Sequence, residues 1–299
     1  MKKTIFPLLA VAVVLGMLFN SCKKSKLNKE TTTSEDNTLA ESMFDDVFKN
    51  TEEVAIKEEG ANKTGMTPEY SFAGTCTATI TATWSTDTTF IADIIIDFGT
   101  NCEGTDGKVR SGKILVSMNK KWLEVGNVTT VTLENYEVDG YKVEGTKTVT
   151  HSAQYVWEIS VTGAKITTPD NEEVTWESTR TRTWVEGQTT GFWTPKDSNG
   201  DGVEDTFMFF DGILDDAYDI TGSASGTNRQ GRQFDVNIST ALHLQFCGWI
   251  PEVTSGVVKI QPEDLKERTV DFGEGTCDNR ATATVGNKEY EFKLRSWDE

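Results

Sequence analysis

Residues 76–84 read Cys-Thr-Ala-Thr-Ile-Thr-Ala-Thr-Trp, and this stretch decides the fold class. Threonine occupies every second position, and the positions between hold Ala78, Ile80, Ala82 and Trp84. A period of two with one apolar face is what a half-buried antiparallel strand requires. The stretch therefore predicts a β-sheet with one face on a core and the other in water.

Runs with the same alternation continue along the chain. They cover residues 90–98, 112–118, 128–138, 141–150, 155–162, 172–186, 217–224, 232–246, 256–260 and 281–294. Asp139-Gly140 and Gly286-Asn287 are hairpin-turn signals between apolar runs. More than about ten strands rarely form one open sheet. We therefore expect residues 68–299 to form one all-β domain, an antiparallel multi-stranded sandwich or a closed or half-closed barrel.

The residues before the first strand have the apolar spacing of a helix instead of a period of two. Leu39, Met43, Phe44, Val47 and Phe48 fall on one stripe, which predicts an N-terminal amphipathic helix over residues 38–57. Thr38 with Glu41 is a candidate capping box, and Gly60 is a candidate stop. We expect the helix to pack against the β domain, although a stripe of this kind can also bind a partner.

The N-terminus has the features of an export signal. Lys2 and Lys3 precede an uncharged, apolar run that is shorter than the roughly 20 residues of a membrane span and ends at Ser21-Cys22. This resembles the lipobox of Bacteroidota-type lipoproteins, with Phe19 and Asn20 in place of the commoner residues. The resemblance implies a signal peptide over residues 1–21, a lipid on Cys22 and a lipidated tether that leads into the helix over residues 22–67. It implies anchoring in the cell envelope at the outer membrane, and both the periplasmic and the surface face stay open.

Two segments of the β region resemble each other. Residues 95–102 and 269–277 share Asp-Phe-Gly followed by a cysteine, and each is preceded by another cysteine. The same segments, with residues 143–150 and 220–226, resemble a group of uncharacterised β-rich lipoproteins, which adds location and no activity. The shared pattern favours an internal duplication over chance similarity among strands.

The four cysteines after Cys22 permit three pairings. The repeat selects Cys76 with Cys102 and Cys247 with Cys277. Disulfides are allowed in an exported protein. Buried free thiols are the alternative.

Residues 197–205, Asp-Ser-Asn-Gly-Asp-Gly-Val-Glu-Asp, match part of a calcium-binding loop. The possible ligands for Ca²⁺ are Asp197, Asn199, Asp201, the carbonyl of Val203, and Asp205. Met208 occupies the position of the usual bidentate glutamate, so another carboxylate would be needed. A surface turn without a cation explains the same residue types.

Charge and motif content narrow the function. The net charge of −18 argues against nucleic acid as a partner. The two histidines, His151 and His243, have no neighbours at metal-ligand spacing, and no hydrolase or phosphate-loop motif occurs. We expect a non-catalytic binding or structural role. The alternative is a glycan-active hydrolase that uses two of the 47 acidic residues as a carboxylate pair.

One strand suggests a ligand face. Alternation over residues 174–184 places Trp176, Arg180, Arg182 and Trp184 on the same side. Indoles beside guanidinium groups can bind a carbohydrate or a protein ligand. The competing interpretation places the tryptophans in the core and pairs the arginines with nearby acids.

Overall fold

The computed structural model describes residues 30–64, 70, 78–87, 90–104, 106–189, 194–196, 206–208, 214–248 and 250–293. The helix is α1 (Thr32–Thr64). The strands before the middle of the chain are β1 (Thr79–Trp84), β2 (Ile91–Asp97), β3 (Cys102–Glu103), β4 (Val109–Met118), β5 (Val128–Val138), β6 (Tyr141–Ala153), β7 (Val156–Thr167) and β8 (Glu173–Glu186). The others are β9 (Thr194–Lys196), β10 (Thr206–Met208), β11 (Ala217–Thr227), β12 (Gln233–Cys247), β13 (Ile250–Pro262), β14 (Arg268–Glu274), β15 (Arg280–Val285) and β16 (Lys288–Lys293).

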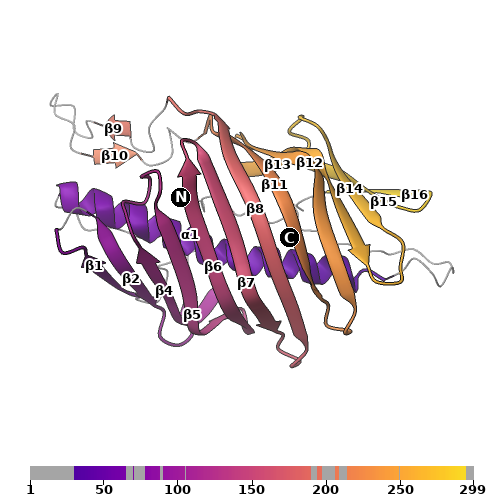
Figure 1. Cartoon of the computed structure of the whole chain (residues 1–299), viewed down its shortest axis with the longest axis horizontal. Coiled ribbons are helices and arrows are strands. Elements are labelled where there is room, and N and C mark those ends of the chain that lie inside the picture. The colour runs from indigo at the N-terminus through magenta and orange to yellow at the C-terminus, as the bar shows by residue number, and fades with distance from the viewer. Residues whose placement is uncertain are drawn as a thin grey trace, which may run out of the picture.

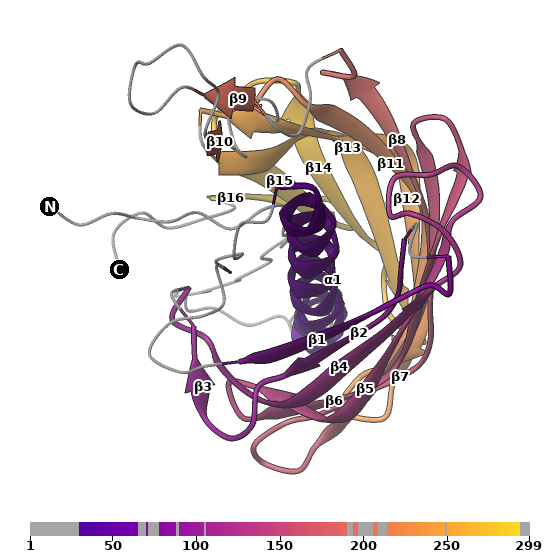
Figure 2. The ribbon, with the colours of Figure 1, turned by 90° about the vertical axis from the view of Figure 1, so that its left-hand side faces the viewer.

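All strands except β9 and β10 form one 14-stranded antiparallel sheet. Its main strands follow chain order from β1 to β16, and the β9–β10 hairpin lies between β8 and β11 in sequence. The all-β prediction with one N-terminal helix is therefore confirmed. The sandwich interpretation is wrong, because one open sheet curls into a half-barrel around α1 instead of a second sheet covering the first (Figure 1, Figure 2).

Glycines within the strands allow this curvature. Strand register shifts at Gly145 in β6 and at Gly222 in β11, and both residues have positive φ. A Cβ on Gly222 would lie 2.1 Å from the carbonyl oxygen of Thr179 on β8. Bulges with glycine bend a sheet where a regular ladder would stay flatter. The curvature of the half-barrel thus depends on glycines within the strands, which the alternating pattern alone would rate as unfavourable for a strand.

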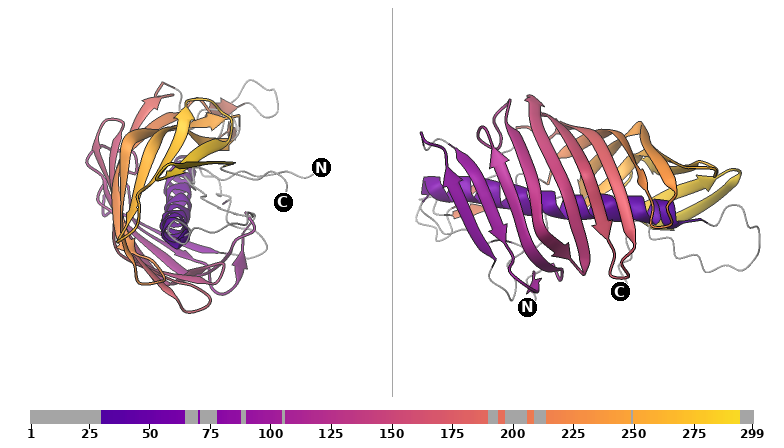
Figure 3. Two further views of the ribbon diagram at one scale, coloured as in Figure 1. Left: turned by 90° about the vertical axis from the view of Figure 1, so that its right-hand side faces the viewer. Right: turned by 60° about the horizontal axis from the view of Figure 1, so that its bottom comes forward.

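Helix α1 lies in the concave face of the half-barrel and crosses the strands (Figure 3). The predicted stripe is correct, since Met43, Phe44, Val47 and Phe48 are buried. The predicted bounds are wrong: the helix starts before Thr38 and continues through Gly60. At its start, Glu30 accepts hydrogen bonds from the N–H and the hydroxyl of Thr33, at 2.7 and 2.8 Å. Contacts with the sheet on several sides extend a helix that its own apolar stripe predicts to be shorter.

Polar contacts fix the position of α1 along the half-barrel. They join Asp36 to Arg229 in the β11–β12 turn, Asn37 and Glu41 to Trp176 and Arg180 on β8, the carbonyl of Phe44 to Lys147 on β6, and Asp46 to Arg110 on β4. The order of these partners shows that α1 runs from the β14 side of the sheet toward the β1 side (Figure 1).

The most buried of these contacts is centred on Asp46. Arg110 donates to both of its carboxylate oxygens, at 2.6 and 3.0 Å, and Tyr136 donates its hydroxyl at 2.8 Å. Burial alone would raise the pKa of Asp46, but the hydrogen bonds and charges of Arg110 and Lys108 hold it well below its usual range. Because removing one member of a buried ion pair leaves an uncompensated charge, this cluster specifies where α1 sits.

The disulfide predicted for the C-terminal Asp-Phe-Gly segment is present. Cys247 is bonded to Cys277, with 5.6 Å between their α-carbons. Cys102 is also disulfide-bonded, and Cys76 lies outside the described residues. The two Asp-Phe-Gly segments fold alike: Asp97 accepts a hydrogen bond from the N–H of Gly99, and Asp271 from that of Gly273, both at 2.9 Å.

Among the described residues, no helix is both long enough and apolar enough to cross a membrane.

Candidate functional site

The four residues of the predicted ligand face all point into the half-barrel, and for the two tryptophans the competing core interpretation is correct. Trp176 and Trp184 are buried, with exposed fractions of 3% and 9%. The indole of Trp176 donates to Asn37 at 2.9 Å, and that of Trp184 donates to Asp216 at 3.0 Å. Aromatic strand residues faced the core, as they usually do, so these indoles are not a platform for a sugar.

The two arginines of that face differ from each other. Arg180 donates to Glu41 at 2.8 Å. Within the described part of the chain, Arg182 forms no hydrogen bond and no ion pair, and its Nε atom is buried. Its guanidinium instead lies 3.7 Å from the centre of the Tyr218 ring. Arg182 is therefore the residue of the predicted face whose N–H donors are not used by another described residue.

Two adjoining cavities lie between α1 and the sheet. The small cavity is about 20 Å³, enough for about one water, and its lining includes Glu52, Trp122, His151, Trp157, Arg182 and Tyr218. The large cavity is about 100 Å³, and its lining is mainly apolar. Phe48, Ile159 and Arg182 line both. The cavities are thus two parts of one candidate site with Arg182 at their junction.

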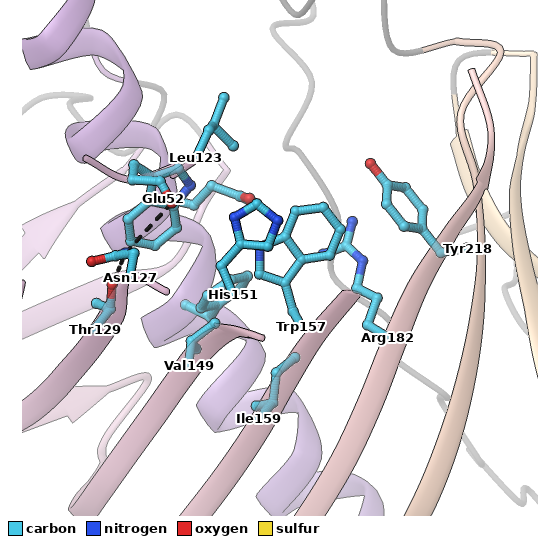
Figure 4. A pocket seen from close by; sticks show the side chains of 12 residues that line it. Glu52, Leu123, Asn127, Thr129, Val149, His151, Trp157, Ile159, Arg182 and Tyr218 are labelled. Carbon is cyan, nitrogen blue, oxygen red and sulfur yellow. Dashed lines mark hydrogen bonds between the residues drawn. The ribbon is translucent and has the colours of Figure 1, made fainter. Parts of the chain in front are cut away.

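A row of flat side chains crosses the sheet at the small cavity (Figure 4). His151 pairs across the strands with Trp157, and Trp157 pairs with Arg182. The rings of His151 and Trp157 stack with their centres 4.7 Å apart. Glu52 reaches toward the row from α1 (Figure 4). The sheet register therefore fixes the order of an imidazole, an indole and a guanidinium, and the Tyr218 ring packs on the guanidinium.

Two side chains of the small cavity have buried nitrogen atoms without a hydrogen-bond partner among the described residues. They are His151, at both ring nitrogens, and Arg182, at Nε. The carboxylate of Glu52 lines the same cavity. Burial lowers the pKa of His151. The nearby backbone of Glu124 and Leu123 opposes this effect, although neither ring nitrogen is placed for a regular hydrogen bond with it. Burial raises the pKa of Glu52, and the charges of Arg182 and Lys147 oppose it. Buried polar groups are normally satisfied, which makes this cluster the strongest functional candidate in the described structure.

The charged residues of the large cavity are more nearly balanced. Lys147 donates to the carbonyl of Phe44 at 3.1 Å and lies 3.9 Å from Asp45. Burial raises the pKa of Asp45 to about 7, and the charge of Lys147 limits the rise. Apart from Arg182, each cation of this cavity therefore has an acidic or carbonyl neighbour.

The predicted calcium loop and the predicted lipid site cannot be placed. Residues 197–205 and Cys22 lie outside the described residues. Within the described ranges, no group of three or more His, Cys, Asp and Glu side chains is arranged to hold a metal ion.

Sequence reasoning missed His151, Glu52 and Tyr218 as site residues. His151 shares the parity of Lys147 and Val149 on β6, so alternation already placed it on the concave face. Glu52 is four residues after Phe48 on the helix, beside the predicted apolar stripe. What the sequence did not contain is the sheet curvature that brings these side chains together.

No protein family, curated protein or solved structure matches this chain.

Proposed function

We propose that this chain is a lipid-anchored protein of the cell envelope, held at the outer membrane through Cys22, with a non-catalytic role in binding a small molecule between α1 and the sheet. The observation that carries the binding role is the pair of adjoining cavities in which the ring nitrogens of His151 and the Nε atom of Arg182 lack hydrogen-bond partners among the described residues. A binding site of this kind combines apolar walls with a few polar groups that fix orientation.

The anchor is supported by the sequence around residue 22. A charged start, an apolar run and a cysteine after a small residue form one continuous pattern. Several acyl chains on one cysteine hold a protein at a membrane far more firmly than a single chain does. The half-barrel would then be carried close to the membrane surface.

Cell fractionation tests the anchor. The wild-type protein is expected in the membrane fraction, and a Cys22→Ser variant in the soluble fraction, because the variant has no site for acylation. Membrane retention of Cys22→Ser would contradict the anchor. Protease treatment of intact cells then reports which face carries the domain.

Native mass spectrometry tests the binding role. Protein purified from its own membranes should carry a bound small molecule. Its mass is the difference between the native complex and the denatured chain. A doubly substituted Phe48→Trp/Ile159→Trp variant, which fills space shared by both cavities, should lose it. Protein that carries no small molecule, and acquires none from an envelope extract, would contradict the binding role.

No observation on the described residues favours the glycan-hydrolase alternative. Glu41 is paired with Arg180, and Asp45 lies beside Lys147. Release of sugar from a glycan panel by the purified protein would establish that alternative in place of binding.

A further inference from the structure

The unpaired guanidinium of Arg182 is the feature from which a ligand class can be inferred. A partly buried arginine is ordinarily paired, because a charge loses hydration energy when it leaves water. Arg110 and Arg180 follow this rule through Asp46 and Glu41. Arg182 has the face of Tyr218 on one side and no carboxylate of the described residues within ion-pair distance. Its planar N–H groups are suited to donating two parallel hydrogen bonds to a carboxylate.

The walls of the large cavity define the other half of the ligand. They are dominated by branched aliphatic side chains from four strands, among them Ile159, Val161, Ile220, Val236, Leu242 and Val258. Such walls offer no hydrogen bonds to the hydroxyl groups of a sugar, so a sugar would lose hydration without compensation. An aliphatic chain loses nothing of this kind and gains apolar contact.

The size of the large cavity limits the length of that chain. A dry cavity of about 150 Å³ binds benzene, which has six carbons. At about 100 Å³, the large cavity should hold about four to six carbons of a flexible chain. The chain would extend from the junction where Arg182 lines both cavities.

Charge balance selects an acid over an amine. Glu52 is the unpaired acid nearby, but it lines the small cavity and is not among the residues that line the large one. In the large cavity, Glu41 and Asp45 already face Arg180 and Lys147. The group that an aliphatic ligand meets at the junction is therefore a cation.

We propose that the large cavity binds the chain of a short aliphatic carboxylate and that Arg182 binds its carboxylate group. This inference rests on the proposed binding function and specifies its ligand class. Arg182 is the residue that distinguishes the acid from a neutral molecule of the same shape. The aliphatic walls set chain length.

The experiment is calorimetric titration of the full mature chain, with Cys22→Ser to keep it in solution, using hexanoate and its neutral analogue hexanamide. Hexanoate should bind at least about tenfold more tightly than hexanamide, because a hydrogen-bonded charge is lost in the amide. Across butyrate, hexanoate and decanoate, affinity should rise with length and then stop rising once the cavity is filled. Equal affinity for hexanoate and hexanamide, or no binding of either, would overturn the proposal.

Arg182→Met supplies the residue-level test, and Arg280→Met is the control. Arg280 is an exposed arginine of β15 that is paired with Glu291 and lines neither cavity. Arg182→Met should weaken hexanoate binding at least about tenfold and abolish the preference over hexanamide, while Arg280→Met should keep both the affinity and the preference. If Arg182→Met fails to melt cooperatively, Arg182→Lys replaces it: this variant should keep a reduced preference, and an unchanged preference would count against bidentate binding by Arg182.

Failure of this proposal can be told from failure of the proposed function. If no aliphatic carboxylate binds but native mass spectrometry finds another small molecule, the ligand class is wrong and the binding role stands. If neither assay finds a bound molecule, both are wrong.

Discussion

Asp216 shows how a single buried carboxyl group organises one end of the site. It accepts hydrogen bonds from Trp184 at 3.0 Å and from Tyr218 at 2.9 Å. Tyr218 in turn supports the guanidinium of Arg182. Burial raises the pKa of Asp216 to about 7, the hydrogen bond from Tyr218 opposes the rise, and the charge of Asp215 adds to it. The residue that orients Arg182 therefore changes charge near neutral pH.

This pKa shift predicts how stability depends on pH. Asp216 binds its proton more tightly in the folded chain than in the unfolded one, whose ordinary value is 3.8. Between about pH 4 and pH 7 the folded state holds more protons, so the free energy of unfolding should decrease as pH rises through this window. Asp45, whose pKa is raised to about 7 by burial, acts in the same direction. Urea unfolding at a series of pH values measures the slope.

Asp216→Asn isolates the contribution of Asp216. The amide can still accept from Trp184, but it does not titrate, so the slope between pH 4 and pH 7 should become shallower. Asp45 and Glu52, whose pKa values are also raised, contribute to the slope that remains, and His151, whose pKa is lowered, acts in the opposite direction. Asp235→Asn, at an exposed position of β12, is the control and should leave the profile unchanged. An Asp216→Asn slope equal to that of the wild type would show that the stability profile does not depend on this carboxyl group.

At the scale of the element, the bulges at glycine decide the shape of the sheet. Gly222 has a φ of 131°, and a Cβ there would lie 2.1 Å from the Thr179 carbonyl oxygen. Gly222→Ala should lower the free energy of unfolding by about 2–4 kcal/mol, through backbone strain and overpacking together. Gly231→Ala is the matched control, because Gly231 also has positive φ (78°) but has nothing within 4 Å of an added Cβ. It should cost only about 1 kcal/mol. Equal losses in urea unfolding would mean that close approach of β8 does not matter.

These glycines also explain what sequence reasoning could and could not predict. Alternation located most strands, since the side-chain period of a strand is a local property. It gave the tryptophans of β8 the correct face but left both a ligand surface and the core open as their environment, because the face of Trp176 is a local property whereas its burial depends on α1, where Asn37 accepts its hydrogen bond. Curvature depends on where a glycine meets the next strand, as at Gly222 and Thr179, and this pairing is not visible in either segment alone.

At the scale of the whole molecule, α1 serves as the core element of an otherwise open sheet. Viewed along the helix axis, the sheet surrounds α1 on all sides but one (Figure 2). Phe44, Val47, Phe48 and Val54 each have exposed fractions of 8% or less. The ring of Phe44 also lies close to Gly145 of β6, where an added Cβ would be 3.1 Å from the Cζ atom of Phe44. One helix thus replaces the second sheet of a sandwich, and the spaces it leaves unfilled are the two cavities.

Deleting α1 should therefore destroy the fold and not merely open the site. Without residues 30–64, the concave face would present a continuous apolar surface, and Arg110 would lose Asp46 and keep Asp106 as its carboxylate partner. Contiguous apolar surface of that extent drives association. We expect the deletion variant to bind a hydrophobic dye, to lose cooperative melting and to elute as aggregates in size-exclusion chromatography.

Two controls make this prediction specific to the helix. Deleting residues 23–29 shortens the chain after residue 22 and leaves α1 intact, so melting should match that of the Cys22→Ser parent. A peptide of residues 30–64, added during refolding of the deletion variant, should restore cooperative melting, because Asp46 and the buried stripe then return to the same partners. The same peptide with Asp46→Leu should restore less, since Arg110, Lys108 and Tyr136 would lose the carboxylate that they share, although Arg110 keeps Asp106. A deletion variant that stays monomeric and melts like its parent would mean that the sheet folds without α1 and that the helix is not needed for its core.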